Sequence, residues 1–108
     1  MGFSTSIENG ATVLRIAGDL DVVALSELRP AVDGIAGRQP PRVVVDLSAL
    51  RLIDSSGVGA IVSLYKAVHA YGGSLAITGA QGQPLAILRL LRLDRLLSDP
   101  DNLAPWPR

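Results

Sequence analysis

A run of β-branched residues followed by a long amphipathic segment limits the fold of this chain more than any other pattern. Val43, Val44 and Val45 stand in succession within residues 42–47. A strand with such a continuous apolar run has both faces buried, which is typical of parallel sheets in α/β proteins. Residues 56–71 then place apolar side chains at helical spacing. A buried strand leading directly into a helix predicts a parallel sheet covered by helices.

A predicted hairpin and a helix precede this strand. Asn9-Gly10 separates two β-capable runs, residues 3–8 and 11–17, and this dipeptide favours a tight hairpin turn. Gly18-Asp19-Leu20-Asp21 then breaks the strand pattern. In the helix that follows, Pro30 removes a backbone donor, so we expect a kink or an irregular first half, and Gly37 is the expected stop.

The rest of the chain continues the alternation. Residues 74–78 indicate another strand, Pro84 fits the first turn of a third helix, and residues 93–98 fit a short strand or turn. The prediction is one α/β domain with a mixed sheet: an N-terminal antiparallel hairpin, then parallel strands, with helices packed against them. We place the domain at residues 3–98 and an irregular tail, with three of the seven prolines, at 99–108.

Composition excludes several classes of function. With no cysteine, the chain has neither a disulfide framework nor a thiolate metal site. Ten basic and ten acidic residues give a net charge of zero, so we expect no binding to nucleic acid. No apolar run approaches the about 18 residues of a membrane span, and the N-terminus lacks a signal peptide pattern. We therefore expect a cytoplasmic protein.

Catalysis and metal binding are both poorly supported. The only histidine, His69, follows Ser55 by 14 residues in the same predicted helix. At about 1.5 Å per residue they lie about 20 Å apart, whereas a nucleophile and its base need about 3 Å. We expect His69 to be a semi-buried helix residue. Asp19, Asp21 and Asp54 offer too few oxygen ligands for a hard cation, so we predict no catalytic site, metal, cofactor or enzyme activity.

Asp54-Ser55-Ser56-Gly57 is the segment with the strongest functional signal. It follows a predicted parallel strand and opens a helix, so its side chains fit helix caps. Gly57 and Gly59 each weaken a helix by about 1 kcal/mol relative to alanine, which suggests close approach by another molecule. The carboxyl ends of parallel strands are also where α/β proteins bind partners and ligands. Capping and binding both remain open on this pattern alone.

Three arginines recur near the end of the chain. Arg89, Arg92 and Arg95 are spaced every three residues, which places them on one side of the last predicted helix. They fit either a solvated face or a contact patch for an acidic partner.

Taken together, these segments resemble the STAS domain. Residues 43–50, residues 53–59 and Gly72-Gly73 carry the resemblance. The turn at residues 18–21 looks like that family's Gly-Glu-Leu-Asp, with Asp19 in place of the glutamate, and residues 90–97 are similar to the segment after its third helix. The resemblance spans about residues 5–98. The intact Asp-Ser-Ser-Gly is similar to that of the anti-sigma factor antagonists within this family.

The resemblance implies a switch at Ser55. In that subfamily the serine after the aspartate is phosphorylated by the anti-sigma factor, which is a serine kinase, and a serine phosphatase reverses the step. The unphosphorylated antagonist binds the anti-sigma factor and releases a sigma factor. A phosphate at a helix N-terminus should leave the domain folded, while its charge disfavours an interface. The implied partner-binding residues are Asp19, Asp21, Asp54, Ser55, Ser56, Gly57, Val58 and Gly59.

Two other functions stay open. A STAS domain can also be a non-phosphorylated subunit of a lipid transporter or another multi-protein regulatory assembly. A small-molecule or nucleotide-binding module is a weaker alternative, because a phosphate-cradling motif is absent. The sequence leaves the oligomeric state undetermined.

Overall fold

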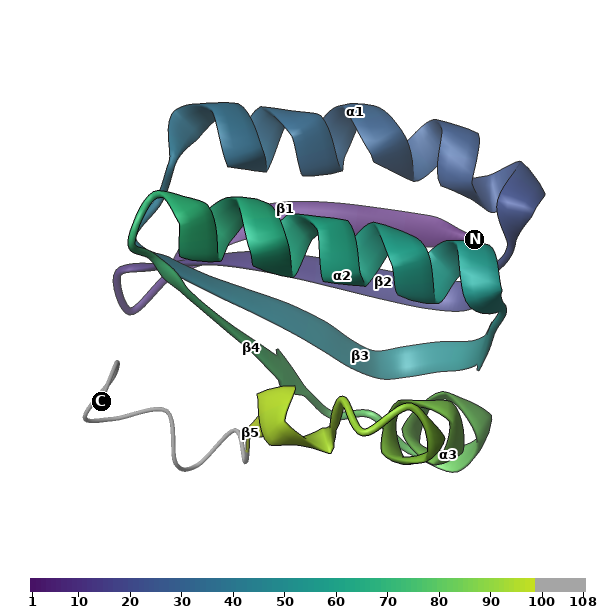
Figure 1. Cartoon of the computed structure of the whole chain (residues 1–108). Helices are drawn as coiled ribbons and strands as arrows, with labels where there is room; N and C mark the ends of the chain where they lie inside the picture. Colours follow the sequence, from purple (N-terminus) through teal and green to yellow (C-terminus); the bar gives the residue numbers. More distant parts are fainter. Residues whose placement is uncertain (99–108) are drawn as a thin grey trace.

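The computed structural model describes residues 1–98 of the chain. The elements in order are β1 (Gly2–Glu8), β2 (Ala11–Leu20), α1 (Val22–Arg38), β3 (Arg42–Ile53), α2 (Ser55–Ala70), β4 (Ser74–Thr78), α3 (Gly82–Leu90), a short 3-10 helix (Asp94–Leu96) and β5 (Leu97–Ser98). The strands form one sheet in the order β1-β2-β3-β4-β5 (Figure 1). β1 and β2 are antiparallel, and all other neighbours are parallel. The predicted mixed α/β sheet is confirmed.

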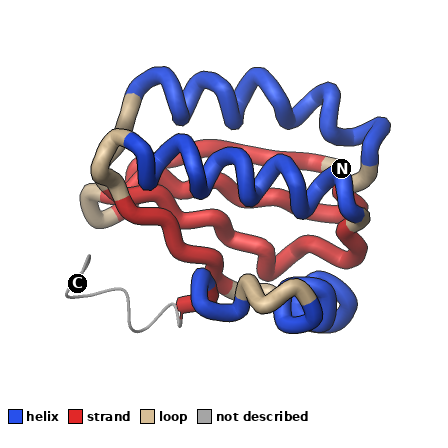
Figure 2. Tube along the Cα trace, in the orientation of Figure 1, coloured by secondary structure: helices blue, strands red, loops and turns tan. Residues whose placement is uncertain are grey.

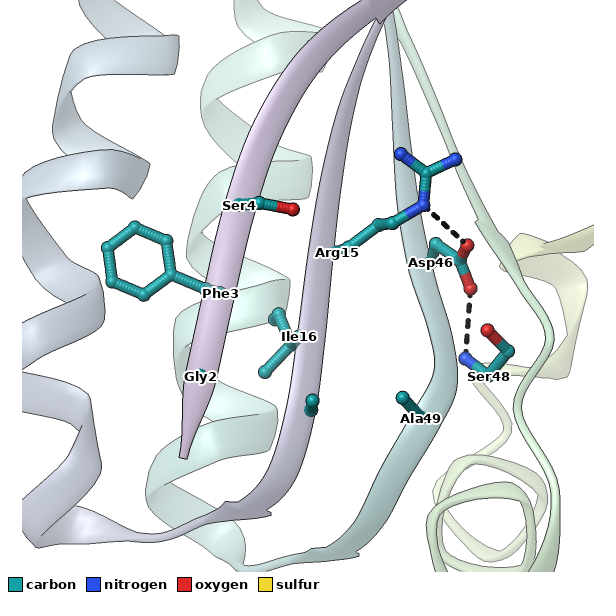
Figure 3. Close-up of a pocket in the computed structure, with 9 residues that line it drawn as sticks. Gly2, Phe3, Ser4, Arg15, Ile16, Asp46, Ser48 and Ala49 are labelled. Atoms are coloured by element: carbon teal, nitrogen blue, oxygen red, sulfur yellow. Dashed lines mark hydrogen bonds and ion pairs between the residues drawn. The ribbon is translucent and has the colours of Figure 1, made fainter.

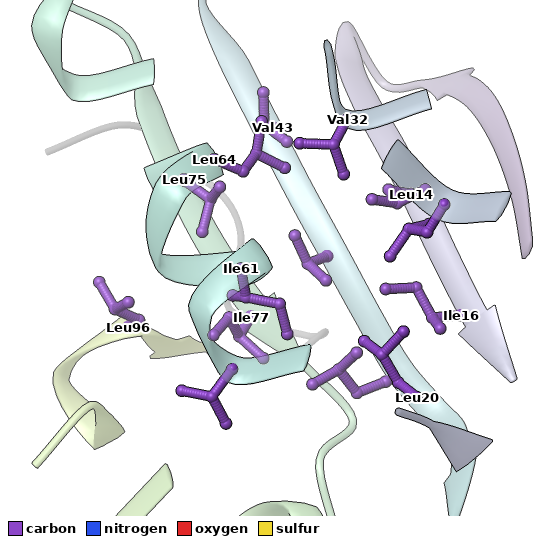
Figure 4. Packing of buried hydrophobic residues seen from close by; sticks show 14 of the residues in the cluster. Leu14, Ile16, Leu20, Val32, Val43, Ile61, Leu64, Leu75, Ile77 and Leu96 are labelled. Carbon is purple, nitrogen blue, oxygen red and sulfur yellow. The ribbon is translucent and has the colours of Figure 1, made fainter. Parts of the chain in front are cut away.

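α1 and α2 form a layer on one face of the sheet and lie side by side over the strands. α3 lies beside the end of β3 that extends past β4 (Figures 1 and 2). The core fills the space between sheet and helices because strands and helices turn their apolar side chains toward each other (Figure 4). The largest fully buried side chains are Leu14, Ile16, Leu20, Leu28, Ile35, Leu47, Leu64, Ile77 and Leu88.

The hairpin forms where the sequence predicts it, but its second strand is longer. Asn9 and Gly10 have φ angles of 52° and 80°, as the two-residue turn that matches strand twist requires. β2 continues through Gly18 and Asp19 to Leu20, so the predicted break at residues 18–21 is wrong. The cause is tertiary: Leu20 is fully buried and pairs with Ile53 of β3.

α1 is an uninterrupted helix despite its proline. Pro30 lies inside it and is exposed, and the predicted irregular first half is wrong. Burial of Leu28, Val32 and Ile35 on one side holds the helix against the sheet and offsets the lost backbone bond. The helix runs through Gly37, where we expected it to stop, and ends at Arg38; Gln39 after it adopts the left-handed conformation.

The remaining helices bring two more corrections. His69 is exposed and stacks on Tyr65 with 5.6 Å between ring centroids, so it is not semi-buried. α3 ends at Leu90, which leaves Arg92 and Arg95 beyond the helix and not on its face. In residues 1–98, no helix is both long and apolar enough to cross a membrane. The tail predicted at residues 99–108 lies outside the described residues.

Candidate functional site

Two helices begin side by side at the carboxyl ends of β2 and β3. Leu20 and Ile53 are paired at the ends of these parallel strands, and the backbone N–H of Asp54 donates to the Leu20 carbonyl at 3.1 Å. α1 starts directly after Asp21, and α2 starts directly after Asp54. The topology therefore brings together two segments that are distant in the sequence.

Aspartates cap both helices. Asp21 Oδ1 accepts a hydrogen bond from the Ala24 N–H at 2.8 Å. Asp54 Oδ1 accepts one from the Gly57 N–H at 3.0 Å, and its Oδ2 accepts one from the Val22 N–H at 3.2 Å. Asp54 thus satisfies open amides of α2 and α1 at once. The capping role predicted for this segment is confirmed for Asp54.

Ser55 takes no part in the capping. It is the first residue of α2, and its side chain is exposed. Within residues 1–98 its hydroxyl makes no hydrogen bond, whereas the neighbouring Asp54 uses both carboxylate oxygens. Ser56, the next residue, is half-buried. A serine that is accessible and is not needed for the helix start is chemically available for modification.

Asp19 lies on β2, two residues before Asp21, and is tied to β3. Its Oδ2 accepts a hydrogen bond from Arg51 Nη2 at 2.7 Å. The Arg51 side chain is 73% exposed, so this ion pair contributes little to stability. The other oxygen of Asp19 is buried and has no hydrogen-bond partner among the described residues. Asp19 therefore borders the aspartate-rich edge but takes no part in either helix cap.

The two glycines of α2 have different surroundings. A Cβ on Gly57 would lie 2.8 Å from side-chain atoms of both Ile53 and Leu20, so only glycine fits there. Gly57 lets the first turn of α2 rest directly on the ends of β2 and β3. A Cβ on Gly59 would meet nothing within 4 Å, and Gly59 is exposed.

Val58 is 6% exposed and belongs to the core. Gly57 is also buried. Both residues were among the predicted partner-binding residues, and in the single chain they offer a partner little surface. The members of the predicted set that remain accessible are Asp19, Asp21, Asp54, Ser55, Ser56 and Gly59.

The sequence analysis did not identify the exposed apolar side chains that lie at the same end of the sheet. Val22 and Val23, in the first turn of α1, are 65% and 77% exposed, and Leu52 of β3 is 42% exposed. Val22 is the residue whose N–H donates to Asp54. Apolar surface beside polar groups is common where proteins bind one another. Only the topology shows this apolar surface, because in the sequence the two valines are typical of an ordinary helix start.

Gln83 is a second residue that sequence reasoning missed. β3 extends beyond its last pair with β4, Asp46 with Thr78, so the end of β3 has no β4 neighbour. There, Gln83 Oε1 accepts from the Ile53 N–H and Gln83 Nε2 donates to the Ile53 carbonyl, both at 2.9 Å. The side-chain amide replaces a neighbouring strand. It holds the backbone immediately before Asp54 and Ser55.

A separate hollow of about 340 Å³ lies over β1, β2 and β3, with α1 and α2 behind the sheet in the view of Figure 3. Arg15 Nε donates to Asp46 Oδ2 at 3.2 Å, and Arg15 Nη2 donates to Glu8 Oε1 at 2.9 Å. Asp46 Oδ1 also accepts from the Ser48 N–H at 2.9 Å. These charges satisfy one another, so the hollow offers a ligand little electrostatic attraction.

Comparison with known proteins identifies the family to which this fold is similar. The family model described as "Mlab, STAS domain" matches residues 3–98. An anti-sigma F factor antagonist of Paenibacillus polymyxa is 30% identical over 94 residues, which cover 86% of this chain and 80% of the relative. The anti-sigma-F factor antagonist RsfB of Mycobacterium tuberculosis is 26% identical over 92 residues, covering 83% and 75%.

Solved structures show the same fold at lower identity. A crystal structure of an anti-sigma factor antagonist from Mycobacterium paratuberculosis superposes with a TM-score of 0.80 at 21% identity, covering 91% of this chain and 83% of the other. The antagonist SpoIIAA in its unphosphorylated form gives 0.73 at 18% identity, covering 91% and 88%. On the family-model match and the 30% identical antagonist, the chain belongs to the STAS domain family and, within it, to the anti-sigma factor antagonists.

Proposed function

We propose that this protein binds an anti-sigma factor and that phosphorylation of Ser55 ends the binding. The proposal rests on the different roles of two neighbouring residues at the start of α2. Asp54 caps the helix with Oδ1 and α1 with Oδ2, while the adjacent Ser55 is exposed and its hydroxyl is unbonded among the described residues. A kinase can therefore modify Ser55 without dismantling the helix start.

In the unphosphorylated state, the surface around Ser55 binds the anti-sigma factor, which is itself the serine kinase, and a sigma factor is released. Polar side chains and exposed apolar groups together suit a protein partner. Gly59, with open space above it, lets the partner approach the helix closely. The proposed contact residues are Asp19, Asp21, Val22, Val23, Leu52, Asp54, Ser55, Ser56 and Gly59.

Electrostatics explains how phosphorylation would end the binding. A phosphoserine adds a charge of about −1.5 to −2. At the N-terminus of α2 the helix dipole favours this charge, so the domain stays folded. In an interface the phosphate would lose its hydration next to the like charges of Asp54 and Asp21, and this costs binding free energy. In support, the relative SpoIIAA matches this chain similarly in its phosphorylated and unphosphorylated forms, with TM-scores of 0.74 and 0.73. A serine phosphatase would restore binding.

The test is affinity capture from an ATP-depleted lysate of the source organism, followed by addition of ATP to the captured complex and phosphosite mapping of the bait. The baits are wild type, Ser55→Asp and the neighbouring control Ser56→Asp. We expect a serine kinase to elute with wild type and the control but not with Ser55→Asp, and phosphate to map to Ser55. Capture of a transporter ATPase, with Ser55 unmodified, would instead favour the assembly-subunit function.

A further inference from the structure

β1 is an edge strand that lacks the features which usually prevent such a strand from pairing with another chain. It pairs with β2 on one side, and no strand among residues 1–98 pairs with its other side. Proteins commonly guard such edges with a charge, a proline or a bulge. β1 contains no proline, and its pairing with β2 is regular along all 7 residues. Its one charged side chain, Glu8, is held by Arg15.

The hairpin register determines which backbone groups of β1 face outward. Glu8 and Ala11 flank the two-residue turn, which such hairpins close with a hydrogen-bonded pair. Hydrogen-bonded and non-hydrogen-bonded pairs then alternate along the ladder. The even-numbered residues of β1 therefore bond to β2. Phe3, Thr5 and Ile7 direct their N–H and C=O groups toward the open edge.

The sequence of β1 is symmetric about Thr5. Residues 3–7 are Phe-Ser-Thr-Ser-Ile, so the order apolar, serine, threonine, serine, apolar is the same in both chain directions. Antiparallel pairing with a second copy, on a two-fold axis at Thr5, sets Phe3 opposite the partner's Ile7 and Thr5 opposite the partner's Thr5. All outward-facing backbone groups of the three residues are then paired. A shift by two residues would leave one of the three without a partner.

We propose that β1 joins two copies of this chain into a dimer with one continuous sheet. The pairing covers Phe3 and Ile7, which are 41% and 73% exposed in the single chain. An isologous contact of this kind closes after two copies and cannot extend into a filament. One strand pair forms a small interface, in the class below about 1,200 Å², so the dimer is weak and depends on concentration. Ser55 follows β3, two strands in from this edge, so the proposal is independent of the switch.

The first test is sedimentation analysis over a range of protein concentrations. Wild type should shift from monomer to dimer as concentration rises. Thr5→Pro removes an outward N–H that β2 does not use, and edge strands tolerate proline. This variant should stay monomeric with its circular dichroism unchanged, whereas the control Ser4→Ala, whose backbone bonds face β2, should dimerise like wild type. A wild type that is monomeric at every concentration would overturn the proposal.

Cysteine cross-linking tests the register and does not depend on Thr5→Pro folding. The chain has no cysteine, so an introduced pair is unambiguous. Opposite residues lie about 5.5 Å apart between Cα atoms, within the about 4.4–6.8 Å range of disulfides. Under oxidation, Thr5→Cys should cross-link with itself, and Phe3→Cys should cross-link with Ile7→Cys. Phe3→Cys alone and Ile7→Cys alone should not; equal cross-linking of all combinations would contradict the two-fold axis at Thr5.

Discussion

Asp54 at the start of α2 accepts a hydrogen bond from the backbone N–H of Val22 at the start of α1, with 3.2 Å between N and Oδ2. The same carboxylate caps its own helix through Gly57 at 3.0 Å. One side chain therefore fixes the relative position of two helix N-termini. Ser55, the next residue, is presented on that joined edge, so the geometry of the proposed switch depends on Asp54.

Asp54→Ala should destabilise the fold by about 1–2 kcal/mol, the cost of losing a helix cap. Two amides lose their acceptor, at Gly57 and at Val22. Asp54→Asn keeps one carbonyl oxygen and should lie between wild type and alanine. Urea denaturation measures the difference. The matched control is Asp33→Ala on the exposed side of α1; equal effects of the two alanine variants would contradict the double cap.

The two glycines of α2 should respond in opposite ways. Gly57→Ala places a Cβ against Ile53 and Leu20 and should cost about 1–3 kcal/mol through overpacking. Gly59→Ala meets open space and should be neutral or stabilise the helix by up to about 1 kcal/mol. Thermal unfolding separates the two. Gly59→Leu should fold normally and lose affinity for the captured partner; unchanged affinity would remove Gly59 from the contact surface.

Gln83→Ala should loosen the end of β3. The Ile53 N–H and C=O lose both partners, and a partly buried unpaired group costs about 1–3 kcal/mol. Hydrogen exchange of the Ile53 amide should speed up in this variant. Gln81→Ala is the control, since Gln81 makes a single exposed bond to the Ser48 carbonyl. Exchange at Ile53 that is the same in both variants would show that Gln83 does not hold this strand end.

Acid should remove the contribution of the Glu8–Arg15 pair. Hydrogen bonds from Arg15 and then Ser6 lower the pKa of Glu8 from 4.5 to about 2. A carboxylate with a lowered folded-state pKa stabilises the fold above its unfolded pKa, and this contribution is lost as pH falls. Between pH 4.5 and about 2, wild type should therefore lose more stability than Glu8→Gln. Glu27→Gln is the control; parallel curves for wild type and Glu8→Gln would refute the effect.

The sequence predicts the fold well because its signals there are local. Asn9-Gly10, the valine run of β3 and the Asp-Ser-Ser-Gly helix start each act through neighbouring residues, and each stands where it was expected. What was missed is non-local. Burial of Leu20 extends β2, and Gln83 reaches Ile53 across 30 positions. Periodicity alone could not expose such contacts, since they depend on how the elements pack.

The same limit applies to the candidate site. Its position at the end of β3 follows from the parallel strand pattern. The strand pattern does not predict which members of the segment are accessible, because Gly57 and Val58 are buried only once α2 packs on β2 and β3. The apolar residues Val22 and Val23 join the site through the strand order alone.

The most direct measurement is phosphate incorporation by the captured kinase, followed by the partner affinity of each product. Wild type and Ser56→Ala should each take up one phosphate per chain, Ser55→Ala should take up none, and phosphorylation should weaken binding by at least about tenfold, or 1.4 kcal/mol. Circular dichroism and unfolding should show the phosphorylated domain still folded. Phosphate on Ser55→Ala, or phosphorylated protein that binds as tightly as the unmodified form, would contradict the switch at Ser55.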